Sequence, residues 1–173
     1  CKRQIKKAKR NKIKVVETDD LKRFLILQDK TFHRQNRYNP VSDNNFYKLD
    51  KYLKKVQKRK IFISQDHLGN DHAGIYLVWD KKSAYYLAGG GDPKFRNSGA
   101  GNLCMWHAIQ FSSTVSEKFD FEGSMIKNIN NFFSNFGGVQ RQYFTIWKSN
   151  SIIISFLLYI KMKLKSKFII NKS

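Results

Sequence analysis

The chain has 173 residues, 41% of them hydrophobic and 14% aromatic, which is enough apolar material for one folded domain and argues against a disordered chain. Lys and Arg number 33 against 13 Asp and Glu, a formal net charge of +20, which favours polyanionic partners such as nucleotide phosphates, tRNA or an anionic membrane face. The two cysteines, Cys1 and Cys104, have no paired spacing, so we expect no disulfide framework and no cysteine-based zinc site, which suits a reducing cytoplasm.

The first residues are strongly basic. Residues 2–12 predict a helix whose apolar points are Ile5 and Ala8, and residues 13–16 predict a short strand. Because the chain starts on Cys1 and enters this basic run abruptly, we expect it to be a piece of a longer protein.

Two amphipathic helices are predicted next. Thr18 is expected to cap the first, which has two aspartates in its first turn and runs to about Arg34. Ser42 is expected to cap the second, after a loop that contains Pro40. The buried stripe of this second helix is predicted to comprise Phe46, Leu49, Tyr52, Leu53 and Val56.

Three strands and a helix are predicted in the middle of the chain. Residues 60–64 and 73–79 flank a turn and predict an antiparallel hairpin, and residues 84–88 predict a third strand. We expect residues 89–98 to form a loop that contains glycines and charges, followed by a helix over 100–114.

Helices and strands alternate after that point. Residues 118–122 predict a fourth strand, residues 125–136 a helix that ends at Gly137, and residues 140–148 a fifth strand. Helices, then a three-strand meander, then helix, strand, helix and strand are typical of an α/β (α+β) fold. The sequence therefore predicts a central mixed sheet flanked by helices.

Residues 152–160 are apolar, but nine residues are too few for a membrane-spanning helix, which needs about 20. Lys161, Lys163, Lys165 and Lys167 follow. A docking helix or an interfacial amphipathic helix fits this pattern better, so peripheral membrane contact through residues 152–167 is one interaction to consider.

The segment that points most directly to chemistry is residues 96–101, which read R-x-x-G-x-G between a strand and a helix. Glycines let backbone N–H groups approach an anion closely, and the start of a helix adds a partial positive charge. Such a loop suits a diphosphate group. The alternative is a glycine-rich loop that only makes a tight strand-to-helix turn.

Several segments, in this order, resemble the C-terminal GNAT domain of bacterial FemAB-like proteins, a group that includes methicillin-resistance and peptidoglycan-bridge proteins. In GNAT acyltransferases R-x-x-G-x-G/A binds the diphosphate of acetyl-CoA. The resemblance covers residues 2–148, and its most specific parts are the FDFEGSM segment from Phe119 and the FGG segment from Phe136. The segments that carry it are residues 3–8, 85–90, 96–101, 106–109, 119–125 and 132–138.

The resemblance implies a GNAT-like fold and an N-acyltransferase that moves an acyl group from acetyl-CoA or another acyl-CoA to an amine in a cell-envelope or small-molecule pathway. It also implies a missing upstream GNAT-like domain, so residues 1–17 would lead in from that domain, residues 18–149 would be the GNAT-like domain, and residues 150–173 a basic and apolar tail. Two alternatives stay open, an aminoacyl-tRNA-dependent peptidoglycan-bridge transferase and a non-catalytic basic binding domain. By this resemblance, the tRNA-dependent enzymes have a lysine at the position that Phe133 occupies here. We therefore expect an acyl-CoA donor.

The resemblance also suggests roles for individual residues. Amine acylation needs a base, a group that polarises the thioester carbonyl, and an acid for the thiolate. Asp120 and Glu122 alternate with two phenylalanines on the predicted strand and should face one side. Glu122 is the preferred base, although either acid could instead form a structural ion pair. Tyr143, or in its place Tyr86, would protonate the thiolate.

The remaining candidates are backbone groups and a possible metal site. The candidate donor-binding residues are Leu87, Ala88, Gly89, Arg96, Asn97, Ser98, Gly99, Ala100 and Gly101. His67 and His72 flank a turn but supply too few ligands for a metal, so no metal is expected. Trp106, Phe132, Phe133 and Phe136 are interpreted as core. Two interpretations stay open for Arg141 and Lys148, a contact with phosphates of the donor or ordinary surface charge.

Overall fold

The computed structural model describes residues 1–39, 41, 43–123, 127–142 and 150–160. Its contacts divide the chain into two units, Cys1–Glu122 and Gly123–Ser173. The first unit consists of α1 (Lys2–Arg10), β1 (Lys14–Thr18), α2 (Leu21–His33), α3 (Asn44–Lys55), β2 (Arg59–Gln65), β3 (Asp71–Trp79), β4 (Ser83–Gly91), the short 3₁₀ helix η2 (Pro93–Phe95), α4 (Ala100–Ser112) and β5 (Lys118–Asp120).

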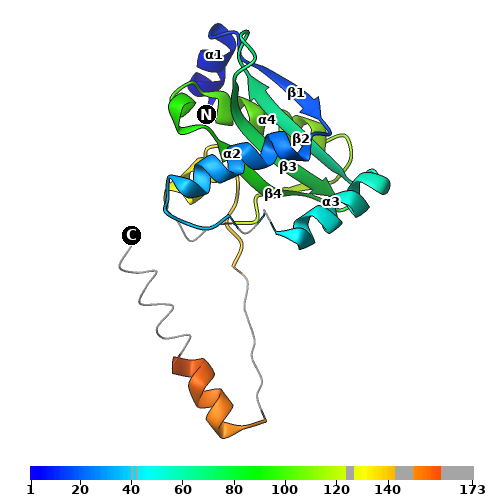
Figure 1. Ribbon diagram of the computed structural model, residues 1–173, viewed down its shortest axis with the longest axis vertical. Helices are drawn as coiled ribbons and strands as arrows, with labels where there is room; N and C mark the ends of the chain where they lie inside the picture. Colours follow the sequence, from blue (N-terminus) through cyan, green and yellow to red (C-terminus); the bar gives the residue numbers. More distant parts are fainter. Residues whose placement is uncertain (40, 42, 124–126, 143–149, 161–173) are drawn as a thin grey trace. The chain divides into compact units, whose positions relative to one another are not determined.

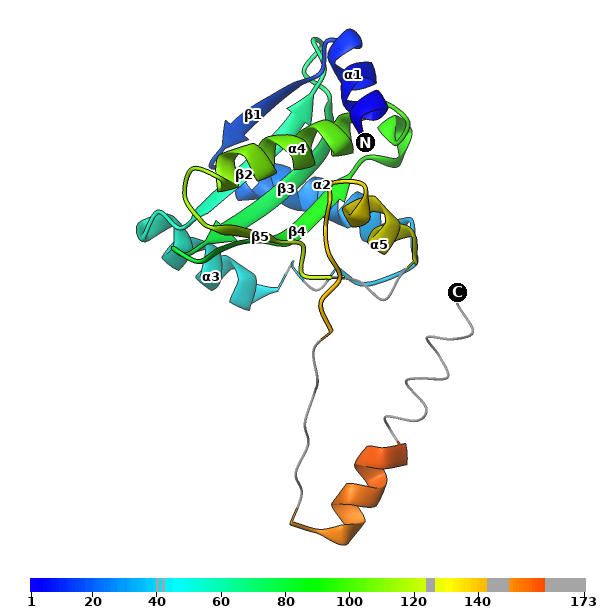
Figure 2. The same ribbon diagram turned by 180° about the vertical axis from the view of Figure 1, so that it is seen from behind.

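The sheet of the first unit is mixed, as predicted. Its strand order is β1-β2-β3-β4-β5; the first four strands pair antiparallel, whereas β4 and β5 pair parallel. Figures 1 and 2, seen from opposite sides, show α2 across one face of the sheet and α4 across the other. The α/β fold with helices on both faces of a mixed sheet is therefore confirmed.

The main core lies between the sheet and α2. Phe24 is fully buried against Tyr76, with ring centroids 5.8 Å apart, and Phe46 packs edge-on against the same ring at 5.0 Å. Leu21, Leu25, Leu27, Ile61, Ile63 and Ala88 complete this cluster. Large buried side chains of this kind each contribute about 1.5–3 kcal/mol relative to exposure, so this cluster fixes α2 on the sheet.

The basic N-terminal segment belongs to this unit and is built into it. Ala8 of α1 is fully buried and packs with Ile13, Ala100 and Leu103. Strand β1 continues to Thr18, which pairs with Ile61 of β2. The predicted helix and strand at residues 2–16 are confirmed, and they place α1 directly beside the start of α4.

The helix caps differ from the predicted ones. Thr18 still belongs to β1, and its hydroxyl accepts the Asp20 N–H at 3.1 Å. The cap of α2 is Asp20, whose carboxylate accepts the Arg23 N–H at 3.1 Å. Ser42 lies outside the described residues, and the cap of α3 is Asp43, which accepts the Phe46 N–H at 2.8 Å.

The predicted stripe of α3 is wrong in part. Leu49, Tyr52 and Val56 are exposed, and the buried residues of α3 are Phe46 and Asp50, with Leu53 partly buried against the core. Asp50 faces inward because buried polar groups hold it: the Tyr76 hydroxyl donates to Asp50 at 2.8 Å, and the buried Arg59 guanidinium lies 3.0 Å from it. An acidic residue on an inner face gives no apolar signal, so hydrophobic periodicity chose the wrong side of the helix.

In the second unit, α5 (Lys127–Ser134) is followed by Gly137 at φ +87°, a glycine signal for the end of a helix that confirms the predicted stop. Residues 140–142 are not in a strand, and residues 143–149 of the predicted fifth strand lie outside the described residues. Residues 152–160 are helical. Within the described ranges, no helix has both the length and the apolar character needed to cross a bilayer.

Candidate active site along the second half of strand β4

Strand β4 is paired on both sides over its first residues only. Ser83, Ala84 and Tyr85 pair with Lys118, Phe119 and Asp120 of β5. Strand β5 ends at Asp120, whereas β4 continues to Gly91 against β3 alone. Among the described residues, the second half of β4, residues 87–91, therefore pairs along one edge only, at a fork between two parallel strands. The expected loop at Gly89–Gly91 is wrong, because pairing with β3 keeps these glycines in the strand.

A bulge marks the point where the fork opens. Ala88 pairs with Tyr76 and Tyr86 pairs with Leu77, so Leu87 has no opposite residue on β3. The Leu87 side chain is 39% exposed. A bulge re-aims the local backbone groups and ends regular pairing, which places backbone N–H and C=O groups of residues 87–89 at the fork.

Tyr86 lies against the backbone of the same strand. Its hydroxyl occupies the space that a side chain at position 89 would need, so Gly89 is required for this tyrosine conformation. Burial, and to a smaller degree the charge of Cys104, raises the pKa of Tyr86. The hydroxyl therefore stays protonated near neutral pH, as a proton donor to a thiolate must.

Helix α2 packs closely on β4 at Gly90. A Cβ atom at Gly90 would lie 2.6 Å from the Gln28 backbone nitrogen, so α2 crosses β4 at the closest distance that glycine allows. The Thr31 hydroxyl accepts the Gly91 N–H at 2.8 Å and lies 3.1 Å from the Gly91 carbonyl oxygen. A side chain thus satisfies the last residue of β4.

The loop at residues 96–101 follows η2 and leads into α4. Its amides alternate in their bonding: the N–H groups of Arg96, Ser98 and Ala100 donate to Pro93 O, Phe95 O and Ser98 Oγ, at 3.3, 2.9 and 3.2 Å. The N–H groups of residues 97, 99 and 101 have no acceptor among the described residues. Three amides around the first turn of α4 are therefore available to an anion.

Two glycines shape this loop differently. Gly99 has φ +84°, and a side chain there would overlap the Gln4 carbonyl oxygen of α1. Gly101 has open space where its side chain would be. Arg96 is exposed, and within the described residues its guanidinium has no ion-pair partner. An Arg and three amides beside an open position fit a diphosphate group.

The two candidate carboxylates lie at the mouth of the fork but not as predicted. The strand ends at Asp120, whose carboxylate accepts the Glu122 N–H at 2.7 Å, and Glu122 itself has φ +59°. Regular alternation therefore stops before Glu122, and the prediction of a strand through Glu122 is wrong. Phe119 and Phe121 do contact each other, with ring centroids 4.8 Å apart. Burial first, and the Asp120 charge second, raise the pKa of Glu122.

Other candidate residues are placed as follows. Tyr143 and Lys148 lie outside the described residues, and Arg141 is exposed. Trp106 is 39% exposed, so it is not a core residue as interpreted, whereas Phe133 is buried. Among the described residues no group of three or more His, Cys, Asp or Glu side chains is arranged for a metal ion.

A cavity of about 290 Å³ is lined by residues of α2, of the turn between β2 and β3, and by Asp92 and Phe95. Phe95, Ile26 and Leu27 contribute its apolar surface. Its cations are already paired, Arg23 with Asp71 and Lys30 with Asp92 at 2.6 Å. The charged groups of this cavity balance one another, in contrast to the unpaired Arg96.

A profile of the acetyltransferase (GNAT) domain matches residues 1–121 of the 173. The chain belongs to the GNAT acetyltransferase family. This GNAT domain coincides with the first unit up to its last residue, so α1 and β1 are part of the domain. No curated protein sequence matches the chain.

Solved structures show the same fold. FemX aligns with a TM-score of 0.62 and 12% identity over 70% of this chain and 47% of FemX, so the chain spans about half the length of FemX. An aminoglycoside acetyltransferase from an uncultured soil metagenomic sample, solved with sisomicin, aligns at 0.59 and 14% over 82% of this chain and 99% of its own. AAC(6')-Iy in complex with a CoA-based bisubstrate analog aligns at 0.59 and 9% over 80% and 99%. At these identities the likeness concerns the fold.

Sequence reasoning found the loop at 96–101 but missed the residues that hold it. Gln4, Thr31 and His72 each contact β4 or the loop from a distant part of the chain. Gln4 lies in the segment 3–8 that carries the resemblance, and His72 flanks a predicted turn, but neither pattern indicates a contact with the loop. Only the glycines at 90 and 99 hinted that another segment approaches closely.

Proposed function

We propose that this chain is an N-acyltransferase that takes its acyl group from acetyl-CoA or another acyl-CoA. The proposal rests on three features of the described part of the chain: the amides of residues 97, 99 and 101 have no acceptor there, Arg96 has no ion-pair partner there, and both lie beyond the end of the open edge of β4. A diphosphate on these amides would let the rest of a linear donor run along residues 87–91. The CoA-based ligand of AAC(6')-Iy, which has the same fold, supports this choice of donor.

The proposed reaction forms an amide and releases CoA. The acceptor amine attacks the thioester carbonyl carbon, the C–S bond breaks, and the amine proton passes to Glu122. The raised pKa of Glu122 makes it a stronger base than an ordinary carboxylate. The thiolate takes a proton from a tyrosine, for which Tyr86 at the fork and Tyr143 are the candidates. Backbone N–H groups near Leu87 would polarise the carbonyl.

Calorimetric titration with CoA tests this donor site. Arg96→Glu should weaken CoA binding by about 10- to 100-fold, since charged hydrogen bonds contribute roughly 1.5–3 kcal/mol each. Its melting temperature should not change, because Arg96 is exposed and makes no ion pair with described residues. Lys51→Glu on the exposed face of α3 has the same change of charge and should bind CoA like the wild type. Equal affinity of the Arg96 variant and the wild type would contradict the proposal.

The acceptor follows less directly from the structure. The sisomicin complex of the soil enzyme supports a small-molecule amine, and the likeness to FemX supports an amine of a cell-envelope precursor, with a further GNAT-like domain upstream. We place the acceptor in one of these two classes. Acetylation of sisomicin and of a lysine-containing peptidoglycan precursor, measured side by side with acetyl-CoA, would separate them.

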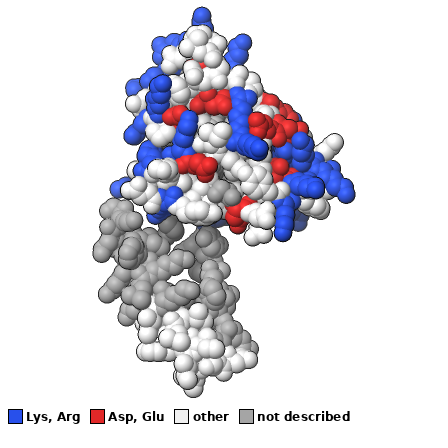
Figure 3. Space-filling view, in the orientation of Figure 1, with Lys and Arg blue, Asp and Glu red and all other residues white. Residues whose placement is uncertain are grey.

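Two other functions are alternatives to acyl transfer from acyl-CoA: transfer from aminoacyl-tRNA, and binding by a non-catalytic basic domain. Figure 3 shows the face of the first unit that carries α2, where Lys and Arg alternate with Asp and Glu. This mixture of charges favours a local anion site over a broad basic surface for tRNA. Phe133 also replaces the lysine expected of the tRNA-dependent type. Salt-sensitive tRNA binding without CoA binding would favour the alternative, and binding of neither would favour the non-catalytic domain.

We propose that the protein is cytoplasmic and that residues 152–167 make a peripheral contact with a membrane. Ile152 and Ile153, in the helix at residues 152–160, are 89% and 73% exposed, and four lysines follow in the sequence. Apolar side chains beside lysines suit an anionic lipid surface. The wild type should co-sediment with vesicles of phosphatidylglycerol and not with vesicles of phosphatidylcholine. The double variant Ile152→Asp/Ile153→Asp should lose this co-sedimentation, and its retention would contradict the contact.

A further inference from the structure

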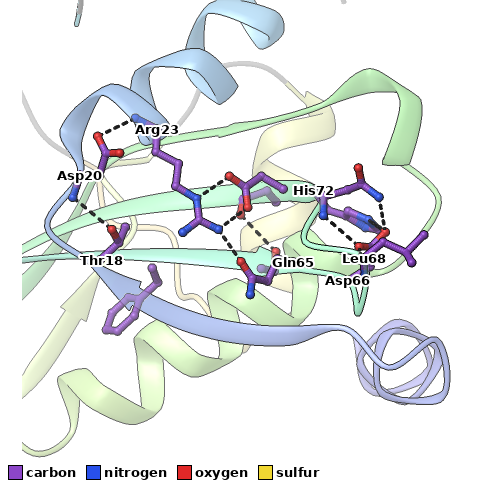
Figure 4. A network of polar contacts seen from close by, with 12 residues as sticks. Thr18, Asp20, Arg23, Gln65, Asp66, Leu68 and His72 are labelled. Atoms are coloured by element: carbon purple, nitrogen blue, oxygen red, sulfur yellow. Dashed lines mark hydrogen bonds and ion pairs between the residues drawn. The ribbon is translucent and has the colours of Figure 1, made fainter.

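A chain of polar side chains runs from the turn between β2 and β3 to the loop at residues 96–101. His72, the second residue of β3, is buried. Its Nε2 lies 3.2 Å from Asp66 Oδ2, and its Nδ1 lies 3.1 Å from Ser98 Oγ. Ser98 Oγ in turn accepts the Ala100 N–H at 3.2 Å. Figure 4 shows Asp66 and His72 facing each other across the turn.

The turn fixes the ionisation of Asp66. Its carboxylate accepts the Asn70 side-chain amide and the N–H groups of Leu68 and Asn70, each at 2.9 Å. These hydrogen bonds, those from Asn70 foremost, hold the pKa of Asp66 well below its usual range. The carboxylate can then only accept a hydrogen bond, so His72 Nε2 carries a proton.

Ser98 contacts His72 Nδ1 whichever of the two donates. When the imidazole carries its only proton on Nε2, Nδ1 accepts from the Ser98 hydroxyl, and when both nitrogens carry protons, Nδ1–H donates to Ser98 Oγ. The same hydroxyl oxygen accepts the Ala100 N–H. Both contacts together leave Ser98 one orientation, in which it satisfies Ala100 while the neighbouring amides at 99 and 101 stay without described acceptors.

His72 also makes two contacts with the segment directly before the loop. The Phe95 ring stacks on the imidazole with centroids 4.0 Å apart and planes 2° apart, and the His72 carbonyl accepts the Asp92 N–H at 2.9 Å. Phe95 directly precedes Arg96, and Ser98 follows two residues later. The contacts of His72 therefore bracket the segment that carries Arg96 and Asn97.

We propose that His72 is a positioning residue for the diphosphate loop and that it acts through Ser98. This inference rests on the proposed function, since it gives the loop a diphosphate to bind. His72 is buried and touches no reacting group; it fixes which amides of the loop remain available and where Arg96 begins.

Two substitutions separate the two hydrogen bonds of the imidazole. The amide of His72→Asn reaches the place of Nδ1 and can keep the contact with Ser98, whereas the longer His72→Gln reaches the place of Nε2 and keeps the contact with Asp66. Loss of a capping hydrogen bond costs about 1 kcal/mol, so His72→Gln should weaken CoA binding about fivefold and His72→Asn by less than about twofold. The KM for acetyl-CoA should rise in step, while kcat at saturating donor should not change.

A donor without the diphosphate provides the control. Turnover with acetyl-pantetheine should be the same in both variants and the wild type, because the loop would not contact this donor. Ser98→Ala should weaken CoA binding as much as His72→Gln does, and combining the two should add nothing, since both remove one link. Additive losses, equal losses in the Asn and Gln variants, or an unchanged His72→Gln would each overturn the proposal.

Hydrogen exchange keeps this inference separate from the proposed function. If the wild type fails to bind CoA, the proposed donor is wrong and a role toward diphosphate falls with it. The positioning of the loop itself is still read from the Ala100 amide, which should exchange faster in His72→Gln than in the wild type and His72→Asn. Equal exchange in all three proteins would overturn the positioning as well.

Discussion

The two halves of strand β4 share β3 as a neighbour on one side, but on the other side only the first half pairs with β5. Ala84 and Tyr85 lie between β3 and β5, and Ala84 is fully buried. Among the described residues, 87–91 pair with β3 alone; they contain a bulge and three glycines and lead to the loop at 96–101. One half completes its backbone hydrogen bonds within the sheet, whereas the other leaves an edge for a ligand. The proposed donor site lies where the sheet has an unpaired edge among the described residues.

The open half is nevertheless closely supported. Gly90 lies against the backbone of α2, Thr31 satisfies Gly91, and α1 covers Gly99. An exposed strand edge with free amides is useful only if it keeps one geometry. Helices α1 and α2 provide that rigidity from two sides. A substitution at each glycine should therefore destabilise the open half more when its new side chain meets backbone atoms than when it meets a movable side chain or open space.

Gly99→Val should have the largest effect. Its side chain would overlap the Gln4 carbonyl oxygen, and a β-branched residue at φ +84° adds backbone strain of about 1–3 kcal/mol. We expect α1 to separate from the loop, with a much lower melting temperature and no CoA binding. Gly101→Ala is the matched control: it meets open space inside a helix and should stabilise by about 0.5–1 kcal/mol. A Gly99 variant as stable as the wild type would show that α1 does not support the loop.

Much of the fold could be predicted from the sequence, because apolar periodicity and turn residues mark the helices and strands directly. The loop at 96–101 was also predictable from its arginine and glycines. The contact between His72 and Ser98 was not, since it joins residues 26 positions apart that only the sheet brings together. The end of β5 was missed for a local reason: Asp120 accepts the Glu122 N–H and turns the chain, which competes with strand pairing in a way that alternation does not reveal.

Gly90→Ala should have the second largest effect on stability, whereas Gly89→Ala should change activity with little change in stability. A Cβ at position 90 meets backbone atoms of α2 at 2.6–2.7 Å, which cannot move without shifting the helix, so we expect a loss of about 1–3 kcal/mol in the free energy of unfolding. At position 89 the obstacle is the Tyr86 hydroxyl, the far end of a side chain that can swing away. Gly89→Ala should therefore unfold at nearly the wild-type urea concentration but change kcat. Equal midpoints for the two variants would contradict this difference between the faces of β4.

Asp120→Asn should have the smallest effect, at the point where the two halves meet. The asparagine oxygen can still accept the Glu122 N–H, so the turn is kept while one negative charge is removed. Because the Asp120 charge contributes to the raised pKa of Glu122, its loss should lower that pKa. A base acts only when it is deprotonated, so activity falls as the pH drops through the pKa of Glu122, and this acidic limb of the kcat/KM profile should move to lower pH in the variant. Glu122→Gln should remove the limb along with most of the activity, at unchanged CoA affinity. If the limb stays in place in Asp120→Asn but vanishes in Glu122→Gln, Glu122 is the base and burial alone sets its pKa; if it persists in Glu122→Gln, the base is another residue.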